Sequence, residues 1–371
     1  MTVIGIDDTD SRDRGMCTTY VATRLVERIR ATGGSVSRAL LVRLNPAVEH
    51  KTRGNAALAI HCDLPGDEAV ERTAAALDRA ETGDPKTNPG AVISEARPDA
   101  VSEDFVGIAR RAVGEYVELD AVRAALATAD VRTIEHGTGR GLVGATAAVG
   151  AFRAFDTWTY ECISYREHKR WGSQRAVDRD SVFAAAEAAY PTVWDTVDRE
   201  EGTAVCVPRT PCPILHGIRG DDPRAVRAVA EGIDSEPVSR RQLFYTNQGT
   251  DAHLRKGALG DLRAGRAYQV TATVADAPET REGGHVFVPI EGNGTELQCV
   301  AFEPTKRFRD RVRALRPGDR VTACGEVKDG ALKLEKFAVR ELVTTERANP
   351  TCPDCGRSMA SAGADAGYRC R

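Results

Sequence analysis

The sequence predicts a multidomain protein of mixed α/β and α+β class. The chain has 371 residues, more than the roughly 100 to 200 residues of one ordinary domain. Helical and strand-like periodicities alternate along its N-terminal part, and short strand-like segments separated by turn residues replace them after Gly260. We therefore expect α/β architecture first, then a β-barrel, and a small metal-binding ribbon at the end.

The composition is that of a globular chain, with 42% hydrophobic and 28% charged residues. No run approaches the ~18 apolar residues of a membrane helix. The N-terminus also lacks the basic and apolar regions of a signal peptide. We therefore expect a cytoplasmic protein without membrane contact, and no obligate protein partner is evident. Because the formal net charge is −3, any argument for a nucleic-acid partner rests on local basic patches.

Residues 1–152 are expected to form an α/β domain, because their apolar residues follow both strand and helix spacing. Its strands are expected at 3–6, 39–44 and 56–62, and its helices at 18–29, 68–80 and 105–127.

Residues 153–258 are expected to form a second domain of the ferredoxin-like type, because their elements follow the order βαββαβ. The expected strands are 158–164, 192–197, 203–208 and 238–246, and the expected helices are 180–189 and 222–232.

Residues 259–345 are expected to form a small barrel of the OB type, since short alternating segments dominate there. The expected strands are 267–275, 285–290, 296–302, 320–328 and 331–343. Residues 346–371 remain for a zinc ribbon.

An acidic loop follows the first expected strand and contains Asp7, Asp8 and Asp10. Ligands commonly bind at the carboxyl ends of strands in α/β folds, and Mg²⁺ in phosphoryl transfer is held by carboxylates and phosphates. The alternative is an acidic turn that only caps the next helix. Thr18, at the expected start of that helix, is either a phosphoacceptor or a plain helix cap.

Two further segments suit phosphate groups. Lys51 and Arg53 lie in a basic turn, although exposed basic turns are common. A glycine-rich loop follows, whose backbone N–H groups can approach phosphates closely; its candidate residues are Gly137, Gly139, Arg140 and Gly141. The loop matches neither a Walker A motif nor a strict dinucleotide fingerprint. Together with the acidic loop, these segments indicate a site for ATP and Mg²⁺.

Polar residues of both signs gather in two segments of the second domain. The first, between a predicted strand and a predicted helix, contains His216, Arg219 and Asp221. The second, at the end of the last predicted strand, contains Asn247 and Asp251. We expect the two segments to converge, although a single histidine is more often structural than catalytic.

The C-terminal part carries two binding signals. Arg307, Arg309 and Arg313 surround an aromatic residue in a dense basic stretch, which suits a nucleic-acid backbone as well as it suits a solvated helix face. A CxxC pair and a later cysteine, at positions Cys352, Cys355 and Cys370, have the spacing of a structural Zn²⁺ site. Redox chemistry is the alternative, but no βαβ unit surrounds the pair. A fourth ligand is expected just beyond the last residue, so we expect an incomplete, weakly binding ribbon.

The chain resembles the archaeal tRNA(Ile) 2-agmatinylcytidine synthetases. The motifs GIDDTDS, GMCTTY, KTRGNAA, KTNPG, HGTGRGLVGA, YECISYR, HGIRGD and FYTNQGTDAHL stand in the family's order, followed by the zinc knuckle. This resemblance covers the chain from end to end and implies four modules: a kinase-like domain, a ferredoxin-like domain, an OB fold and a zinc ribbon.

The resemblance implies an ATP-dependent ligase that attaches agmatine to C2 of the wobble cytidine of tRNA(Ile) with a CAU anticodon, so that AUA is read. The route it implies runs through a phosphorylated cytidine. It assigns Mg²⁺ to Asp7, Asp8 and Asp10, phosphorylation to Thr18, and agmatine to residues 216–221 and 247–251. The competing hypotheses are a small-molecule kinase or ligase, which would not need the barrel and ribbon, and a non-catalytic RNA-binding protein, which leaves the acidic loop unexplained.

Overall fold

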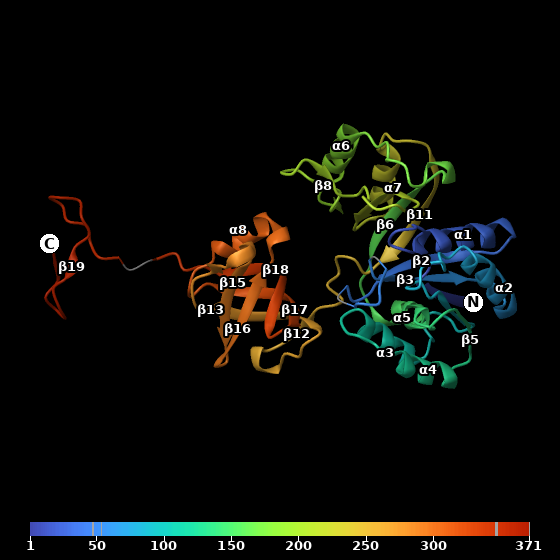
Figure 1. Cartoon of the computed structure of the whole chain (residues 1–371), viewed down its shortest axis with the longest axis horizontal. Coiled ribbons are helices and arrows are strands. Elements are labelled where there is room, and N and C mark those ends of the chain that lie inside the picture. Colours follow the sequence, from blue (N-terminus) through green and yellow to red (C-terminus); the bar gives the residue numbers. More distant parts are fainter. Residues whose placement is uncertain (47, 53, 346–347, 371) are drawn as a thin grey trace. The chain divides into compact units, whose positions relative to one another are not determined.

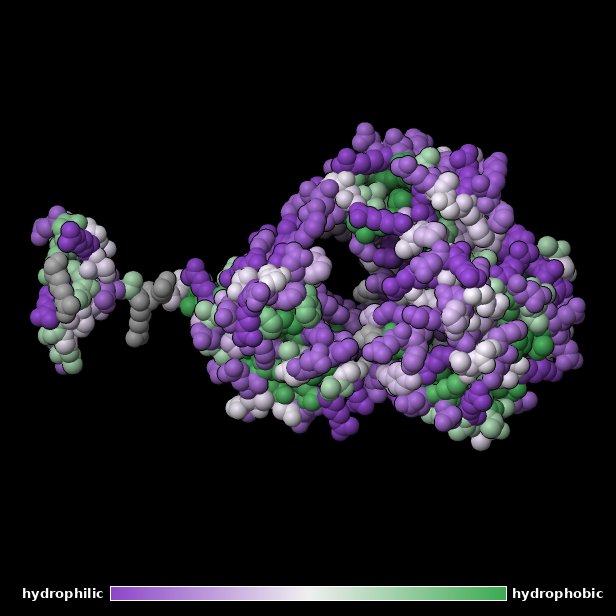
Figure 2. Space-filling model, viewed as in Figure 1, coloured by the Kyte–Doolittle hydropathy of each residue, from purple (hydrophilic) through white to green (hydrophobic). Residues whose placement is uncertain are grey.

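The structure, a computed structural model, describes residues 1–46, 48–52, 54–345 and 348–370. Its contacts divide the chain into one unit of residues 1–255 and another of residues 256–371 (Figure 1). Among the described residues, no helix combines the length and the apolar character needed to span a bilayer. The visible face of each unit is largely hydrophilic, with hydrophobic residues in scattered small patches (Figure 2).

The N-terminal part of the first unit alternates strands and helices. Its strands are β1 (Thr2–Asp7), β2 (Val36–Arg43), β3 (Ala56–Cys62), β4 (Gly90–Ser94) and β5 (Val131–Glu135). Its helices are α1 (Thr18–Ala31), α2 (Gly66–Leu77), α3 (Glu103–Ala112), α4 (Leu119–Thr128) and α5 (Gly141–Ala154).

The rest of the first unit contributes further strands and a pair of helices. Its main elements are β6 (Thr159–Arg166), α6 (Arg179–Ala189), β7 (Val193–Trp194), β10 (Ile214–Gly220), α7 (Pro223–Gly232) and β11 (Val238–Thr246). A short hairpin, β8 (Val197–Asp198) with β9 (Thr203–Ala204), lies outside the main sheet.

One sheet runs through the whole first unit. In the described part of the chain it has nine strands, in the order β5-β4-β1-β3-β2-β11-β6-β10-β7. The parallel pair β2–β11, with Leu40 opposite Tyr245 and Leu41 opposite Thr246, joins the two halves. The domain boundary expected near residue 152 falls in the last turn of α5, and strands from both sides of it belong to the same sheet, so the division stays a prediction.

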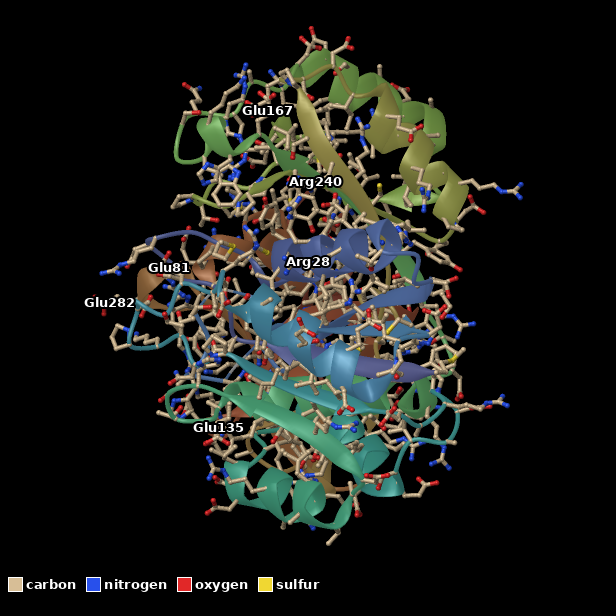
Figure 3. The ribbon with its side chains drawn as sticks, turned by 90° about the vertical axis from the view of Figure 1, so that its right-hand side faces the viewer. Arg28, Glu81, Glu135, Glu167, Arg240 and Glu282 are labelled. Atoms are coloured by element: carbon tan, nitrogen blue, oxygen red, sulfur yellow. The ribbon has the colours of Figure 1, made fainter. Side chains whose placement is uncertain are left out.

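Helices cover both faces of this sheet, as alternating side chains require. Residues of α1 and α2 form one core with alternate residues of the strands, including Ile163 and Tyr165 of β6. Helices α3 and α5 pack on the opposite face. Cys162, which points away from Ile163, packs with α6 and α7. Arg240 of β11 reaches α1, where it pairs with Glu27 at 2.9 Å and donates to the hydroxyl of Tyr20 at 3.0 Å (Figure 3).

The structure corrects several expected elements of this unit. The helix expected at 105–127 is interrupted, because the carbonyl of Ala112 accepts the backbone N–H of Asn45 at 2.8 Å and the carboxylate of Glu115 pairs with Arg255. Strands β4 and β5 were not expected. The strand expected at 203–208 is only the short β9, and β10 takes its place in the sheet. Strand β10 was not predicted, because the prolines before it and the glycines within it are typical of turns.

The second unit contains a closed barrel. In its described residues the barrel strands are β13 (Arg266–Val274), β15 (Val286–Gly292), β16 (Thr295–Ala301), β17 (Arg320–Lys328) and β18 (Ala331–Glu341). They pair in the order β13-β17-β18-β16-β15, and β15 pairs again with β13. The prediction of a five-strand barrel is confirmed, with strand ends within a few residues of those expected.

Short elements complete the second unit. Helix α8 (Arg307–Arg313) lies between β16 and β17 in the sequence. β12 (Arg255–Lys256) spans the division between the units, and β14 (Glu279–Thr280) pairs with β15. In the ribbon, β19 (Ala360–Ser361) pairs with β20 (Tyr368–Arg369).

A buried ion pair fixes the segment between β6 and α6. Arg166 binds Glu236 through two hydrogen bonds of 2.7 and 3.0 Å, and both side chains are 1% exposed. The guanidinium also donates to the carbonyls of Ser173 and Gln174, and Glu236 accepts the backbone N–H of Ala176. Burial alone would raise the pKa of Glu236, but these hydrogen bonds hold the pKa below its usual range.

We predict that Glu236→Gln destabilises the first unit by about 3 to 5 kcal/mol at pH 7, because it leaves Arg166 buried without a counter-charge. Since the pKa of Glu236 is depressed on folding, its contribution is present at neutral pH and is lost as the pH falls through the folded pKa. The difference from the parent should therefore shrink below about pH 4. Urea unfolding of the full chain across this pH range measures it. Glu231→Gln, on the exposed face of α7, is the matched control, and an equally stable Glu236→Gln protein would contradict the prediction.

Candidate active site

The acidic loop begins where β1 ends, and its carboxyl groups are crowded. Burial raises the pKa of Asp7 well above its usual range, and the charges of Asp8 and Asp10 add to this effect. Burial likewise raises the pKa of Asp8 to about 6, although the backbone N–H of Asn88 donates to this carboxylate at 2.9 Å. The oxygens of these crowded carboxylates form a donor set that Mg²⁺ accepts.

Hydrogen bonds from distant segments hold the acidic loop in place. Thr52 donates to the carboxylate of Asp10 at 2.6 Å, and Thr87 donates to its carbonyl at 2.7 Å. The backbone of Asp8 has φ 59° and that of Met16 has φ 58°. Such left-handed conformations are costly for residues other than glycine and persist where the surroundings enforce them, often at functional sites.

Thr18 is the first residue of α1 and is buried beside the acidic loop. The hydroxyl of Thr9 donates to the hydroxyl of Thr18 at 3.1 Å. The N-cap of α1 is Cys17, so the helix-cap interpretation of Thr18 is wrong. The hydroxyl of Thr18 therefore lies at a helix N-terminus, where backbone N–H groups favour an anion.

Asn88 ties the acidic loop to the glycine-rich loop. Its side-chain oxygen accepts the backbone N–H of Thr138 at 2.9 Å, while its own backbone N–H serves Asp8. Gly137 has φ 59°, and a Cβ atom there would lie 2.3 Å from that side-chain oxygen, so glycine is required. Asn88 was not among the predicted site residues; its place directly before a proline in KTNPG was the available signal.

These loops line a cavity of about 350 Å³. Its lining includes Asp7, Asp8, Asp10, Thr18, Lys51 and Arg140. It also includes Glu161, Gly217 and Arg219, together with Val205, Cys206, Pro208, Thr210, Cys212 and Ile214. A neighbouring hollow of about 410 Å³ shares Arg140 and is bordered by Thr138 of the glycine-rich loop. Arg53 lies outside the described residues.

A chain of ion pairs includes three residues that line the cavity. Glu161 pairs with Arg43 at 2.8 Å and with Arg219 at 3.4 Å, and Arg219 reaches Asp195 at 2.6 Å. Burial alone would raise the pKa of Glu161, but the two guanidinium groups hold the pKa below its usual range. Glu161 and Arg43 were not among the predicted site residues; a carboxylate inside an apolar strand pattern was the available signal.

Of the polar residues predicted in the second domain, Arg219 reaches the cavity. His216 is fully buried with its pKa lowered by burial to about 4, so its ring is neutral. Asn247 uses its amide to bond the backbone of Arg43 at 2.7 and 3.0 Å. Asp221 accepts the indole N–H of Trp194 at 3.0 Å. These residues and Asp251 are not among the described residues that line the cavity.

The C-terminal candidates fall into two groups. The sulfur atoms of Cys352, Cys355 and Cys370 lie within 4.8 Å of one another. Backbone N–H groups of Cys355 and Asp354 lower the pKa of Cys352 to about 7, which favours the thiolate form that Zn²⁺ binds.

The predicted arginines of the barrel unit are partly engaged in its structure. Arg309 is 15% exposed, donates to the carbonyl of Gly284 at 2.6 Å and pairs with Glu303. Arg313 donates to Thr280 at 3.0 Å and to Asp310 at 2.5 Å. Arg307 is exposed at the start of α8. Arg309 therefore has a structural role in addition to any role toward RNA.

The chain matches three family models. They are described as the TiaS TCKD domain, over residues 3–64, the TiaS FLD domain, over residues 139–253, and the TiaS C-terminal zinc ribbon domain, over residues 349–371. Curated relatives carry the name TiaS and are 2-agmatinylcytidine synthetases of an isoleucine tRNA. The one from Haloquadratum walsbyi is 50% identical over 100% of this chain and 89% of its own length, and the one from Methanosarcina acetivorans is 42% identical over 100% and 88%.

Solved structures are similar over the same length. A complex of TiaS with its isoleucine tRNA and ATP has a TM-score of 0.87 and 38% identity, covering 100% of this chain and 88% of that one. A complex of TiaS with the same tRNA, AMPCPP and agmatine has a TM-score of 0.86 and 35% identity, covering 99% and 90%. By these full-length matches, the chain belongs to the TiaS family of tRNA(Ile) 2-agmatinylcytidine synthetases.

Proposed function

We propose that this chain uses ATP to join agmatine to C2 of the wobble cytidine of the tRNA(Ile) that carries a CAU anticodon, which allows AUA to be decoded. The observation that carries the proposal is the cavity of the first unit. Its lining combines carboxylates, a helix-terminal hydroxyl and cations with a second charged group, Arg43–Glu161–Arg219. These groups suit phosphates, a metal ion and a polar substrate.

The ATP side of the cavity is assigned to the acidic loop and the phosphate-binding residues. Asp7, Asp8 and Asp10 would hold Mg²⁺, because all three line the cavity and their carboxylate oxygens are ligands that Mg²⁺ accepts. When bound, Mg²⁺ would neutralise these carboxylates and bind oxygens of the triphosphate. Lys51, Arg53, Arg140 and the glycine-rich loop, including Gly137, Gly139 and Gly141, are proposed to bind the phosphates.

The chemistry explains why a phosphoryl step is needed. The C2 oxygen of cytosine is a poor leaving group, and phosphorylation makes it a good one. The amine nitrogen of agmatine then attacks C2, the C2–O bond breaks, and phosphate leaves with that oxygen. Thr18, beside the carboxylates and at the positive end of α1, is proposed to accept a phosphoryl group from ATP during the cycle.

For agmatine, we propose the part of the cavity around Glu161. Its buried carboxylate is held by Arg43 and Arg219, which compensate its charge and fix its orientation. Of the residues first expected to bind agmatine, Arg219 is retained. His216, Asp221, Asn247 and Asp251 are replaced by Glu161 and the segment 205–214, because these line the cavity.

Four modules account for the whole chain in this proposal. Residues 1–152 form the kinase-like catalytic part. Residues 153–258 form a ferredoxin-like part, supported by the strand order β11-β6-β10-β7. Residues 259–345 form an OB fold, supported by the closed strand order and by a helix between the third and fourth barrel strands. Residues 346–371 form the zinc ribbon, with structural Zn²⁺ on its cysteines. The barrel and ribbon hold the tRNA, and such a substrate places the enzyme in the cytoplasm.

We predict that Thr18→Ala abolishes phosphorylation of the protein by ATP and reduces agmatine incorporation to below about one per cent of the parent rate, because alanine offers no acceptor oxygen. Mass spectrometry of the protein and of the nucleosides of the isoleucine tRNA provides both readouts. Thr18→Ser should keep both activities in part.

Thr32→Ala, at the exposed far end of α1, is the control and should behave as the parent. Full phosphate incorporation in Thr18→Ala would remove Thr18 from the mechanism. If the parent itself adds no agmatine to this tRNA(Ile), the proposed function is wrong.

We predict that Arg307→Ala with Arg313→Ala flattens the salt dependence of tRNA binding, because each lost phosphate contact lowers the log–log slope by roughly 0.7 to 0.9. Affinity should suffer more than specificity, since phosphate contacts do not read bases. Salt titrations of binding to the isoleucine tRNA test this, with Arg266→Ala on β13 of the same barrel as a control for general charge loss. An unchanged slope would place α8 outside the RNA interface.

A further inference from the structure

Arg175 binds the backbone of the segment that leads into β10. It lies between β6 and α6, and its guanidinium donates to the carbonyl oxygens of Pro208 at 2.8 Å, Thr210 at 2.9 Å and Ile214 at 2.8 Å. The same group contacts the carbonyl oxygen and the sulfur of Cys212, both at 3.2 Å. Each nitrogen of the planar guanidinium thus donates a hydrogen bond to the backbone of residues 208–214.

This segment is a wall of the catalytic cavity. Residues 205–213 lie between β9 and β10 and form turns and bends. Their alternate members Cys206, Pro208, Thr210 and Cys212, with Ile214, line the cavity. The backbone carbonyls of turns and bends need hydrogen-bond donors from outside the segment. Arg175 supplies these N–H donors, as a neighbouring strand would in a sheet.

The wall also approaches the acidic loop. A Cβ atom on Gly15 would lie 3.3 Å from the carbonyl oxygen of Pro211, so the segment comes up against the turn that precedes Thr18. Behind the wall, the backbone N–H of Ala176 is bound by Glu236, the partner of Arg166. The buried ion pair therefore fixes the backbone next to Arg175, and Arg175 in turn fixes the segment that lines the cavity.

We propose that Arg175 is a positioning residue that sets the fit of the amine substrate by fixing residues 208–214 as one wall of the cavity. This inference rests on the proposed function. The wall adjoins the residues proposed to bind agmatine, because the backbone N–H of Gly217 donates to the carbonyl of Cys206 at 3.0 Å and a Cβ atom on Gly217 would lie 2.9 Å from the carboxylate of Glu161. A loosened wall should therefore impair the use of agmatine more than the use of ATP.

Steady-state kinetics of the full chain with the isoleucine tRNA, ATP and agmatine test this inference. Arg175→Lys keeps the charge and most of the stem but loses the fork, so it should raise KM for agmatine about tenfold or more. In the same variant, KM for ATP should stay within about twofold of the parent value. Arg209→Ala, at an exposed arginine in the same segment, is the control, and its KM values for ATP and for agmatine should both stay within about twofold of the parent. The variant should also accept amines of other lengths, such as putrescine, with less discrimination than the parent.

A rescue experiment separates positioning from general stability. In Arg175→Ala, added guanidinium ion can occupy the vacated place, and it should lower KM for agmatine in this variant but not in the parent. A parental KM for agmatine in Arg175→Lys would overturn the inference. So would ATP and agmatine constants that worsen together without rescue, since Arg175 would then serve only folding. A parent that attaches no agmatine would instead overturn the proposed function itself.

Discussion

Crowded negative charge at the end of β1 is the constraint on which the rest of the first unit depends. Asp7, Asp8 and Asp10 are brought together where burial raises the pKa of Asp7 and Asp8. Helix α5 lies so close that a Cβ atom on Gly144 would be 1.9 Å from the carboxylate of Asp7. Such an arrangement costs folding free energy unless a cation or protons compensate the charge. A bound cation would relieve this cost.

The continuous sheet determines how the two sides of the cavity meet. Strands β2 and β11 pair in parallel, and the amide of Asn247 extends that pairing by binding the backbone of Arg43. Arg43 then reaches across to Glu161 on β6. The side that carries the acidic loop and the side that carries Glu161 are thus parts of one packed unit. We infer that nucleotide and amine meet in a cavity whose walls are held by hydrogen bonds from both sequence halves.

Local patterns in the sequence predicted much of this fold. Buried positions alternate along most of the barrel strands β13 and β15. The acidic loop and α1 lie where strand and helix spacing predict them, because those signals depend on neighbours a few residues apart. Strand β10 was missed because its flanking prolines and its glycines have the local signature of a turn. The break between α3 and α4 depends on Asn45, far away in the sequence, which captures the carbonyl of Ala112.

As with the fold, only part of the candidate site could be predicted from the sequence. Its acidic residues, Thr18, Lys51 and Arg140 could be predicted because each lies in a short motif whose residue types indicate phosphate or metal binding. Asn88, Glu161 and Arg175 act through partners distant in sequence, so spacing alone could not reveal them. His216 shows the opposite case, since a histidine in a polar motif proved to be a neutral side chain in the sheet interior.

The most direct test of this account is the Mg²⁺ dependence of agmatine incorporation in Asp8→Asn, together with calorimetric titration of Mg²⁺ into the protein in the presence of a non-hydrolysable ATP analogue. If the acidic loop holds the cation, the substitution raises the Mg²⁺ concentration for half-maximal rate and weakens the calorimetric affinity by about tenfold or more. Asp13→Asn, exposed in the same loop, leaves both values at those of the parent. Parental Mg²⁺ dependence and affinity in Asp8→Asn would contradict the assignment of the loop as the metal site.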